Sequence, residues 1–161
     1  MKKIVIMSDN HGISDAMTRV YELEPDGDYY IHCGDSEARR KEELAGYICV
    51  MGNNDWGLKL PKESKLSIEG VDILITHGQF FGYFNKEDKM IALLKKNDCT
   101  VLLSGHTHMP SIQEVDGYLL VNPGSTNLPR GGSDPSYAIM TIDQGEINVE
   151  IKDFYYDDYE G

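Results

Sequence analysis

The sequence predicts an α/β domain built around two mixed β-sheets, and three observations lead to this fold class. Short apolar runs with strand character recur along the 161 residues. The earliest runs are separated by segments with helical periodicity, which indicates parallel pairing through crossovers. The later runs are mostly separated by turn residues alone, which indicates hairpins. A chain of this length buries a sufficient core without staples, so residues 1–161 are expected to form a single domain.

The first half alternates predicted strands and helices. The apolar run at 4–7 is followed by a helical repeat of apolar positions at Ile13, Ala16, Met17 and Val20. Turn residues at 25–28 precede a second run, and a short helix is expected over 37–45 before a third. The strands expected from these runs cover residues 4–7, 29–34 and 47–52.

The second half is richer in strand signals. Runs at 65–68 and 71–76, joined by Glu69-Gly70, predict a hairpin. An amphipathic helix that begins at Asn85 or Asp88 should bury Met90, Ile91, Leu93 and Leu94. Further strands are expected over 101–105, 111–115, 118–122, 137–143 and 146–155. The acidic, aromatic end at 153–161 is expected to be a solvated terminus, with a contact to another subunit as the alternative.

The composition excludes several function classes. The net charge of −12 and the lack of basic clusters argue against stable nucleic-acid binding. The apolar runs are too short for a membrane span or a secretory signal, so no membrane contact is expected. The three cysteines lack the spacing of a disulfide framework or a zinc site, which favours a reducing, cytoplasmic location. A homo-oligomer is compatible with these observations.

Seven potential metal ligands stand just after the apolar runs. If each run is a strand of an α/β sheet, these side chains gather along one edge, where such sheets place their ligand sites. A lone histidine is more often a packing or hydrogen-bonding residue, as we expect for His32 inside its strand, but the order and spacing of the set argue against coincidence. The sequence therefore predicts a metal centre for hydrolytic chemistry. Its candidate ligands are Asp9, His11, Asp35, Asn53, His77, His106 and His108.

The donor types in this set suit a pair of divalent cations. Two such cations clamp a phosphate group and lower the pKa of a water molecule for in-line displacement. A shared ligand must offer two oxygens and a negative charge, which a carboxylate such as Asp35 supplies and a histidine does not. Nitrogen and oxygen donors without thiolate suit manganese, which we expect first, with iron, nickel, cobalt or zinc as alternatives.

The motifs closely resemble those of the calcineurin-like metallophosphoesterases. Their spacing is similar to that of the compact YfcE-like branch of bacteria and archaea, and the likeness spans residues 8–125, including the loop at 122–125. The resemblance implies a four-layer fold in which two mixed sheets pack as a sandwich flanked by helices. The motifs are Ser8-Asp9-Asn10-His11, Gly34-Asp35, Gly52-Asn53-Asn54-Asp55, Thr76-His77-Gly78 and Gly105-His106-Thr107-His108.

Carried over residue by residue, the resemblance also implies how the ligands divide. One cation would take Asp9, His11 and His108, and the other Asn53, His77 and His106. Asp35 would bridge the two. The nucleophile would be a hydroxide between the cations, which attacks phosphorus in line without a covalent enzyme intermediate.

Asn54 departs from a neighbouring branch of this superfamily. In the protein Ser/Thr phosphatases, the residue after the asparagine ligand is a histidine that helps to protonate the leaving group. Asparagine is no general acid near neutral pH, so Asn54 is expected to support the site and to contact substrate. Asp55 is expected to orient a ligand or Asn54 through a hydrogen bond.

Charge counting favours phosphodiesters as substrates. Two divalent cations less Asp9, Asp35 and one hydroxide leave a single positive charge, which matches a diester monoanion. Arg130, the only arginine beyond the first quarter of the chain, is a candidate phosphate contact on a loop. Tyr83 and Phe84 either line a substrate pocket or, as we expect first, pack in the core.

The expected function is therefore that of a cytosolic two-metal phosphodiesterase that acts on small phosphodiesters. Two alternatives stay open. One is a phosphomonoesterase that acts on small phosphorylated metabolites. The other is a non-catalytic scaffold that retains the fold, against which the complete ligand set argues.

Overall fold

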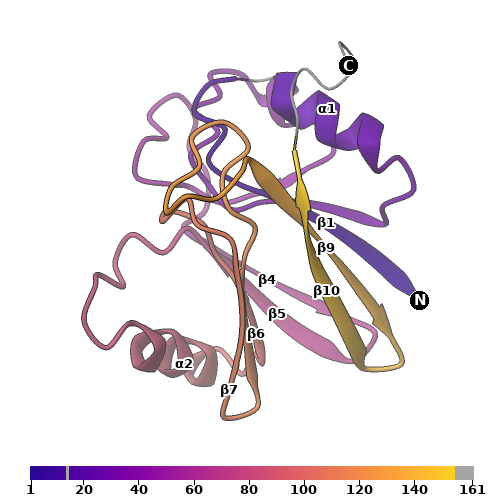
Figure 1. The fold of residues 1–161 in the computed structure, drawn as a ribbon, viewed down its shortest axis with the longest axis vertical. Coiled ribbons are helices and arrows are strands. Elements are labelled where there is room, and N and C mark those ends of the chain that lie inside the picture. The colour runs from indigo at the N-terminus through magenta and orange to yellow at the C-terminus, as the bar shows by residue number, and fades with distance from the viewer. Residues whose placement is uncertain (14, 155–161) are drawn as a thin grey trace.

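Two five-stranded β-sheets pack face to face in the computed structural model, which describes residues 1–13 and 15–154 (Figure 1). The first sheet contains β1 (Lys2–Met7), β2 (Tyr29–His32), β3 (Ile48–Cys49), β9 (Ser136–Asp143) and β10 (Glu146–Asp153). The second contains β4 (Glu63–Ile68), β5 (Val71–Thr76), β6 (Val101–Leu103), β7 (Ser111–Val115) and β8 (Tyr118–Asn122). The strand orders are β10-β9-β1-β2-β3 and β4-β5-β6-β8-β7.

Both sheets are mixed, so the predicted α/β fold class is confirmed. In the first, β1, β2 and β3 are parallel, whereas β9 and β10 run antiparallel beside β1. In the second, β5, β6 and β8 are parallel and the edge strands β4 and β7 are antiparallel. Because parallel strands need a crossover, α1 (Asp15–Leu23) joins β1 to β2 and α2 (Lys86–Lys96) joins β5 to β6.

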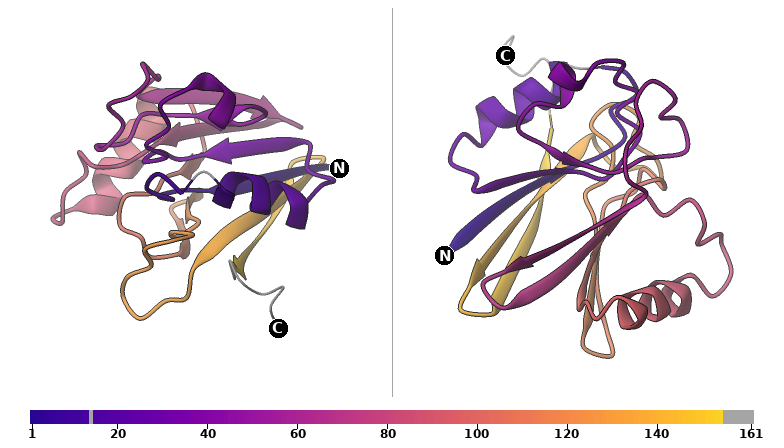
Figure 2. Two further views of the ribbon diagram at one scale, coloured as in Figure 1. Left: turned by 90° about the horizontal axis from the view of Figure 1, so that it is seen from above. Right: turned by 180° about the vertical axis from the view of Figure 1, so that it is seen from behind.

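Alternation of side chains along the strands builds three apolar layers. Ile4 and Ile6 on one face of β1 lie in the core between the sheets, whereas Val5 on the other face packs under α1. In β5, Ile75 points into the core between the sheets and Leu74 packs under α2. The helices therefore cover the two outer faces, which gives the four-layer arrangement (Figures 1 and 2).

The predicted helix over 37–45 is wrong. Only a 3₁₀ turn, Lys41–Leu44, lies in this segment. Glu37 has a φ of 55°, which a right-handed helix excludes, and its amide donates to Asp55 Oδ1 at 2.7 Å. Tertiary hydrogen bonding thus overrides the local helix signal here. Ile13 also lies outside α1 and is 44% exposed, contrary to the predicted helical face.

Of the strands that lead to the predicted ligands, β1 and β5 end as predicted, whereas β2, β3 and β6 end earlier than expected. β2 ends at His32 and β6 at Leu103, because the chain must leave the sheet before the loops that carry the polar residues. At the other end of the chain, Phe154 is fully buried, so the predicted solvated terminus is wrong for this residue. The remainder of that prediction, 155–161, lies outside the described residues. Within the described chain, neither helix combines the length and apolarity needed to cross a membrane.

Candidate metal centre

The predicted ligands lie in loops that follow strands of both sheets. Asp9 and His11 follow β1, Asp35 follows β2 and Asn53 follows β3, whereas His77 follows β5 and His106 and His108 follow β6. Backbone hydrogen bonds tie these loops together. The Asp9 amide donates to the Gly34 carbonyl at 3.0 Å, and the Gly105 amide donates to the His77 carbonyl at 3.0 Å. The carboxyl ends of the parallel strands in both sheets thus converge on one place.

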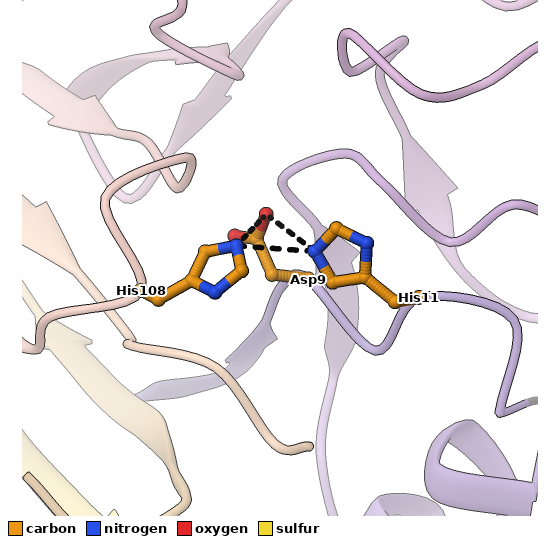
Figure 3. Close-up of side chains that lie close together, drawn as sticks. All are labelled: Asp9, His11 and His108. Atoms are coloured by element: carbon orange, nitrogen blue, oxygen red, sulfur yellow. Dashed lines mark hydrogen bonds and ion pairs between the residues drawn. The ribbon is translucent and has the colours of Figure 1, made fainter. Parts of the chain in front are cut away.

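Asp9, His11 and His108 form the first group of candidate ligands (Figure 3). Asp9 Oδ1 lies 3.3 Å from His108 Nε2 and 3.7 Å from His11 Nε2. The two ring nitrogens are themselves only 3.1 Å apart. Three side chains from two loops therefore direct their ligand atoms at a common point.

Asp9, Asp35 and His77 form the second group. His77 Nε2 lies 3.2 Å from Asp35 Oδ2 and 3.7 Å from Asp9 Oδ1, and Asn53 Oδ1 is 3.0 Å from the same nitrogen. Asp9 belongs to both groups. Asp35 Oδ2 also lies 3.9 Å from His11 Nε2, so both carboxylates face both groups. His106 belongs to neither group in the described chain, but its ring packs edge-on against His77 with centroids 5.2 Å apart.

The hydrogen bonds of the histidines determine which ring nitrogen is available for a metal. His11 Nδ1 donates to Glu37 Oε2 at 2.7 Å, His108 Nδ1 to the Leu128 carbonyl at 2.7 Å, and His77 Nδ1 to the Cys33 carbonyl at 2.8 Å. In each neutral ring the proton is therefore on Nδ1, and Nε2 presents a lone pair.

The Nε2 atoms and the carboxylate oxygens are all hydrogen-bond acceptors, and they lie close together without a donor between them. The His11 and His108 lone pairs face each other, and the His77 lone pair faces Asn53 Oδ1. Asp9 Oδ1 is fully buried and lacks a hydrogen-bond partner among the described residues. Buried acceptors without donors are costly, whereas a cation placed between them removes the cost. The donor set therefore fits divalent cations.

When His77 takes up a proton at Nε2 in the absence of a cation, the lone pair there is replaced by a donor and the charged groups of the centre stabilise one another. Burial alone would raise the pKa of the Asp35 carboxyl, but hydrogen bonds and charge from His77 and two bonds from Asn54 hold it well below its usual value. Asp9 behaves alike, since His108 and His77 outweigh its burial and lower its pKa. Burial opposes protonation of His77, yet Asp35 and Asp9 raise its pKa. Both carboxylates are thus ionised near neutral pH, as metal ligands must be.

The backbone around the centre is unusual. Eleven non-glycine residues of the described chain have a positive φ, and five of them are predicted ligands: Asp9, His11, Asp35, His106 and His108. Such conformations cost about 1–3 kcal/mol each and gather at functional sites. The motif glycines allow close approach. A Cβ on Gly34 would lie 2.6 Å from His77 Nδ1, and one on Gly105 would lie 2.6 Å from Asp9 Oδ2.

Comparison with known families agrees with this arrangement. Residues 1–145 match the model of the calcineurin-like phosphoesterase superfamily domain. The chain belongs to this superfamily. It is similar to the probable metallophosphoesterase YsnB of Bacillus subtilis, at 32% identity over 93% of this chain and 90% of that protein. It is also similar to the phosphodiesterase YfcE of Escherichia coli K12, at 30% identity over 89% of each chain.

Solved structures share the fold of this chain. A predicted phosphoesterase from Streptococcus pneumoniae superposes with a TM-score of 0.84 at 30% identity, over 96% of this chain and 93% of that one. Vps29 from Entamoeba histolytica, solved in complex with Zn²⁺, superposes with a TM-score of 0.73 at 19% identity, over 95% and 99% of the chains. The second likeness concerns the fold alone. These comparisons confirm the four-layer fold that the motifs implied.

Asn54 and Asp55 both act on Asp35 in this phosphoesterase fold. The Asn54 amide donates to Asp35 Oδ1 at 2.8 Å, and its side-chain Nδ2 donates to Asp35 Oδ2 at 3.2 Å. Asp55 Oδ2 accepts the amides of Asp35 and Gly52 at 2.8 and 2.7 Å. Asp55 therefore holds the backbone that carries the carboxylate, whereas Asn54 holds the carboxylate itself.

Glu37 is a residue beside the candidate centre that sequence reasoning missed. Its carboxylate accepts from His11 Nδ1 at 2.7 Å, which is the orientation that metal-binding histidines receive from a supporting carboxylate. The left-handed turn that brings it there has no local sequence signal beyond its place two residues after Asp35. His32, by contrast, has the structural role expected for it. It is fully buried, its Nδ1 accepts the Gly34 amide at 3.0 Å, its Nε2 lies 2.7 Å from Asn10 Oδ1, and burial lowers its pKa to about 4.

Arg130 and the loop at residues 80–84, which carries several aromatic side chains, lie at the edge of the metal centre. The Arg130 amide donates to the His108 carbonyl at 3.0 Å, and its side chain lines a cavity together with His106 and Tyr83. Tyr83 is 96% exposed and Phe84 is 82% exposed, so core packing, the favoured expectation for both, is wrong. Phe81 is the buried aromatic of this loop instead.

Proposed function

We propose that residues 1–161 form one catalytic domain, a metal-dependent phosphodiesterase that hydrolyses small phosphodiesters at a dinuclear centre. Asp9, His11 and His108 hold one cation, and Asn53, His77 and His106 hold the other, with Asp35 shared between them. Manganese is the expected metal, and iron, nickel, cobalt and zinc are alternatives. Two bound cations would supply charge for the phosphate oxygens and lower the pKa of water.

The main support for the proposal is the close approach of hydrogen-bond acceptors that have no donor between them. His11 Nε2 and His108 Nε2 lie 3.1 Å apart while both Nδ1 atoms donate elsewhere. His77 Nε2 has the same relation to Asn53 Oδ1 at 3.0 Å. Two such points, with carboxylates facing both, support two cation positions.

The protein groups around the cations have positioning roles. Asn54 and Asp55 keep Asp35 oriented, which a shared ligand requires. Asn54 is half-buried and is also the proposed polar contact to substrate. Arg130 contributes a guanidinium at the edge of the centre for a phosphate oxygen. No described side chain of the centre other than a histidine ligand is a general acid near neutral pH, which favours substrates with good leaving groups.

Hydrolysis of bis(4-nitrophenyl) phosphate before and after metal removal tests the proposal. Chelator treatment should abolish turnover, and Mn²⁺ should restore it. The His77→Ala variant should fold, as judged by circular dichroism, but should have lost nearly all turnover in Mn²⁺. Metal-independent turnover, or full activity in His77→Ala, would refute the proposal.

The two alternatives give different results in the same assays. A phosphomonoesterase would hydrolyse 4-nitrophenyl phosphate with a higher kcat/KM than the diester. A scaffold would hydrolyse neither compound and would retain fewer than two metal ions per chain in excess Mn²⁺. The fold shared with Vps29 is the observation that keeps a scaffold under test.

A further inference from the structure

A cavity of about 290 Å³ opens directly beside the metal centre. His106, a proposed ligand, lies on its wall, so a substrate group bound there would be close to the scissile phosphate. Thr107, Lys86 and Arg130 also line it, from the loop after β6, the first residue of α2 and the loop after β8. A volume of this size holds a substituent rather than a whole drug-sized ligand.

The charge of this cavity is opposite to that of the protein. The chain has 27 acidic and 15 basic residues, yet the described residues that line the cavity include no carboxylate. Lys86 and Arg130 are both there, and neither forms an ion pair with a carboxylate within residues 1–13 and 15–154. Burial lowers the pKa of Lys86, although Glu87 opposes this effect, so the ammonium group is partly desolvated. Two cations without partners favour an anionic ligand.

Thr107 adds a neutral donor. Its Oγ1 accepts hydrogen bonds from Asn122 Nδ2 at 3.0 Å and from the Met109 amide at 3.3 Å. These bonds occupy both lone pairs, and the hydroxyl hydrogen has no acceptor in the described chain. Ammonium, guanidinium and hydroxyl donors from three elements match the three terminal oxygens of a phosphate monoester better than the two of a carboxylate.

We propose that this cavity binds a second phosphate group of the substrate, and that Lys86 is a specificity-determining residue for it. The preferred substrates are then phosphodiesters that carry a phosphate monoester besides the scissile group. Tyr83, exposed on the rim, offers its ring face to a planar part of the same substrate. The inference rests on the proposed function and extends it to a substrate class. It also predicts a preference opposite to that expected from the net charge of −12.

The first test compares two chromogenic esters with the same scissile bond. Thymidine 5′-(4-nitrophenyl phosphate) lacks a second phosphate, and its 3′-phosphorylated analogue carries one. The Mn²⁺-loaded protein should show a kcat/KM at least about tenfold higher for the analogue, because a hydrogen bond to a charged group contributes enough free energy for a tenfold change. Lys86→Met should reduce that ratio about tenfold, whereas Arg130→Gln, which also removes the proposed phosphate contact at the metal centre, should lower kcat/KM for both esters. Lys95→Met, the same change at an exposed position of α2 outside the cavity, should leave the ratio unchanged.

Binding of unreactive products provides a readout without turnover. By calorimetry, the Mn²⁺-loaded protein should bind thymidine 3′,5′-bisphosphate about tenfold more tightly than thymidine 5′-monophosphate, and Lys86→Met should remove the difference. Tighter bisphosphate binding without hydrolysis of either ester would support the subsite and refute the proposed catalysis. Hydrolysis of both esters with equal kcat/KM and equal product binding would overturn the subsite and leave the catalysis standing. A preference for the second phosphate that survives Lys86→Met would overturn the role of Lys86.

Discussion

Two buried groups of charged side chains in this molecule have opposite hydrogen-bond balance. Glu24, next to the carboxyl end of α1, accepts from Lys3 Nζ at 2.8 Å, Tyr137 Oη at 2.6 Å and Lys152 Nζ at 3.3 Å. Every acceptor there meets a donor. At the metal centre, Asp9 Oδ1 lies against two histidine Nε2 atoms that present lone pairs. The hydrogen-bond acceptors of the Glu24 cluster are therefore satisfied within the protein, whereas those of the metal centre need cations from solution.

This difference distinguishes a charge cluster that stabilises the fold from one that binds a ligand, even when no ligand is bound. A cluster that stabilises the fold satisfies its own buried groups, because each unsatisfied group lowers stability. A cluster that binds a metal keeps acceptors unsatisfied and tolerates backbone strain at the same residues. Substitutions that remove a negative charge should therefore change the free energy of unfolding in opposite ways at the two clusters.

The largest expected effect is that of Asp9→Asn. Metal binding and kcat/KM should fall by more than about 100-fold, since even outer-sphere changes at metal sites cost 10–100-fold. At a pH at which His77 is neutral, the free energy of unfolding of the metal-free protein should be unchanged or higher, because an amide Nδ2 donates where Oδ1 has no partner. Asparagine also tolerates the φ of 57° at this position. Urea unfolding in chelator measures the stability, and a loss of more than about 1 kcal/mol would contradict the comparison.

Glu24→Gln should show the reverse pattern. Removing the charge of this buried, hydrogen-bonded carboxylate weakens its bonds to Lys152 and to Lys3, which keeps its ion pair with Asp26, so we expect a loss of about 2 kcal/mol in the free energy of unfolding. Metal content and kcat should remain as in the wild type. Glu22→Gln, an exposed position on the same helix, is the matched control and should change stability by less than about 0.5 kcal/mol. Equal stabilities of the two variants would mean that the cluster has no structural role.

The contribution of Glu24 should also disappear in acid. Burial opposes ionisation of Glu24, but Lys3, Tyr137 and Lys152 outweigh it and lower its pKa below the ordinary value of 4.5. The unfolded chain therefore takes up this proton first as the pH falls. The stability difference between wild type and Glu24→Gln should be constant above pH 4.5 and should shrink as the pH falls below it. Urea unfolding of both proteins in chelator across this pH range measures the stability difference. A difference that grows as the pH falls would mean that the pKa of Glu24 is raised by folding, not lowered.

The smallest predicted effect is that of Glu37→Gln. Glutamine retains the hydrogen-bond geometry to His11 but removes the negative charge that increases the basicity of the ring. Mn²⁺ affinity should fall about tenfold, at the lower end of such outer-sphere changes, without loss of the fold. Glu42→Gln, exposed in the neighbouring 3₁₀ turn, provides the control titration. An unchanged Mn²⁺ affinity would show that Glu37 does not support His11.

Much of the fold was predictable from the sequence because apolar periodicity is a strong local signal. The hairpin of β4 and β5, the helix α2 and the alternation that sorts Ile4 from Val5 all follow from it. The segment around Glu37 was not predictable, because its left-handed turn depends on a hydrogen bond to Asp55, which is distant along the chain. Phe154 shows the same limit: an acidic, aromatic end indicates exposure, yet this ring packs against Tyr137.

The candidate site was predictable as a set of residue types and only partly as an arrangement. Position after strands indicated that Asp9, His11, Asp35 and His77 would meet. Sequence did not reveal that Asp9 faces both groups, because side-chain direction depends on the packing of two sheets. It also gave no reason to single out Lys86, since a lysine at the start of a helix is common and only the tertiary structure places it in the wall of the same cavity as His106.

If the unsatisfied acceptors at this site mark two cation positions, the protein should bind two metal ions, and the number of bound ions can be measured. Wild-type protein and Asp9→Asn should be equilibrated with excess Mn²⁺, freed of unbound metal and analysed by plasma mass spectrometry. Two Mn²⁺ ions per wild-type chain and fewer than one per chain of the variant are expected. One ion or none in the wild type, or an equal content in both proteins, would contradict this expectation.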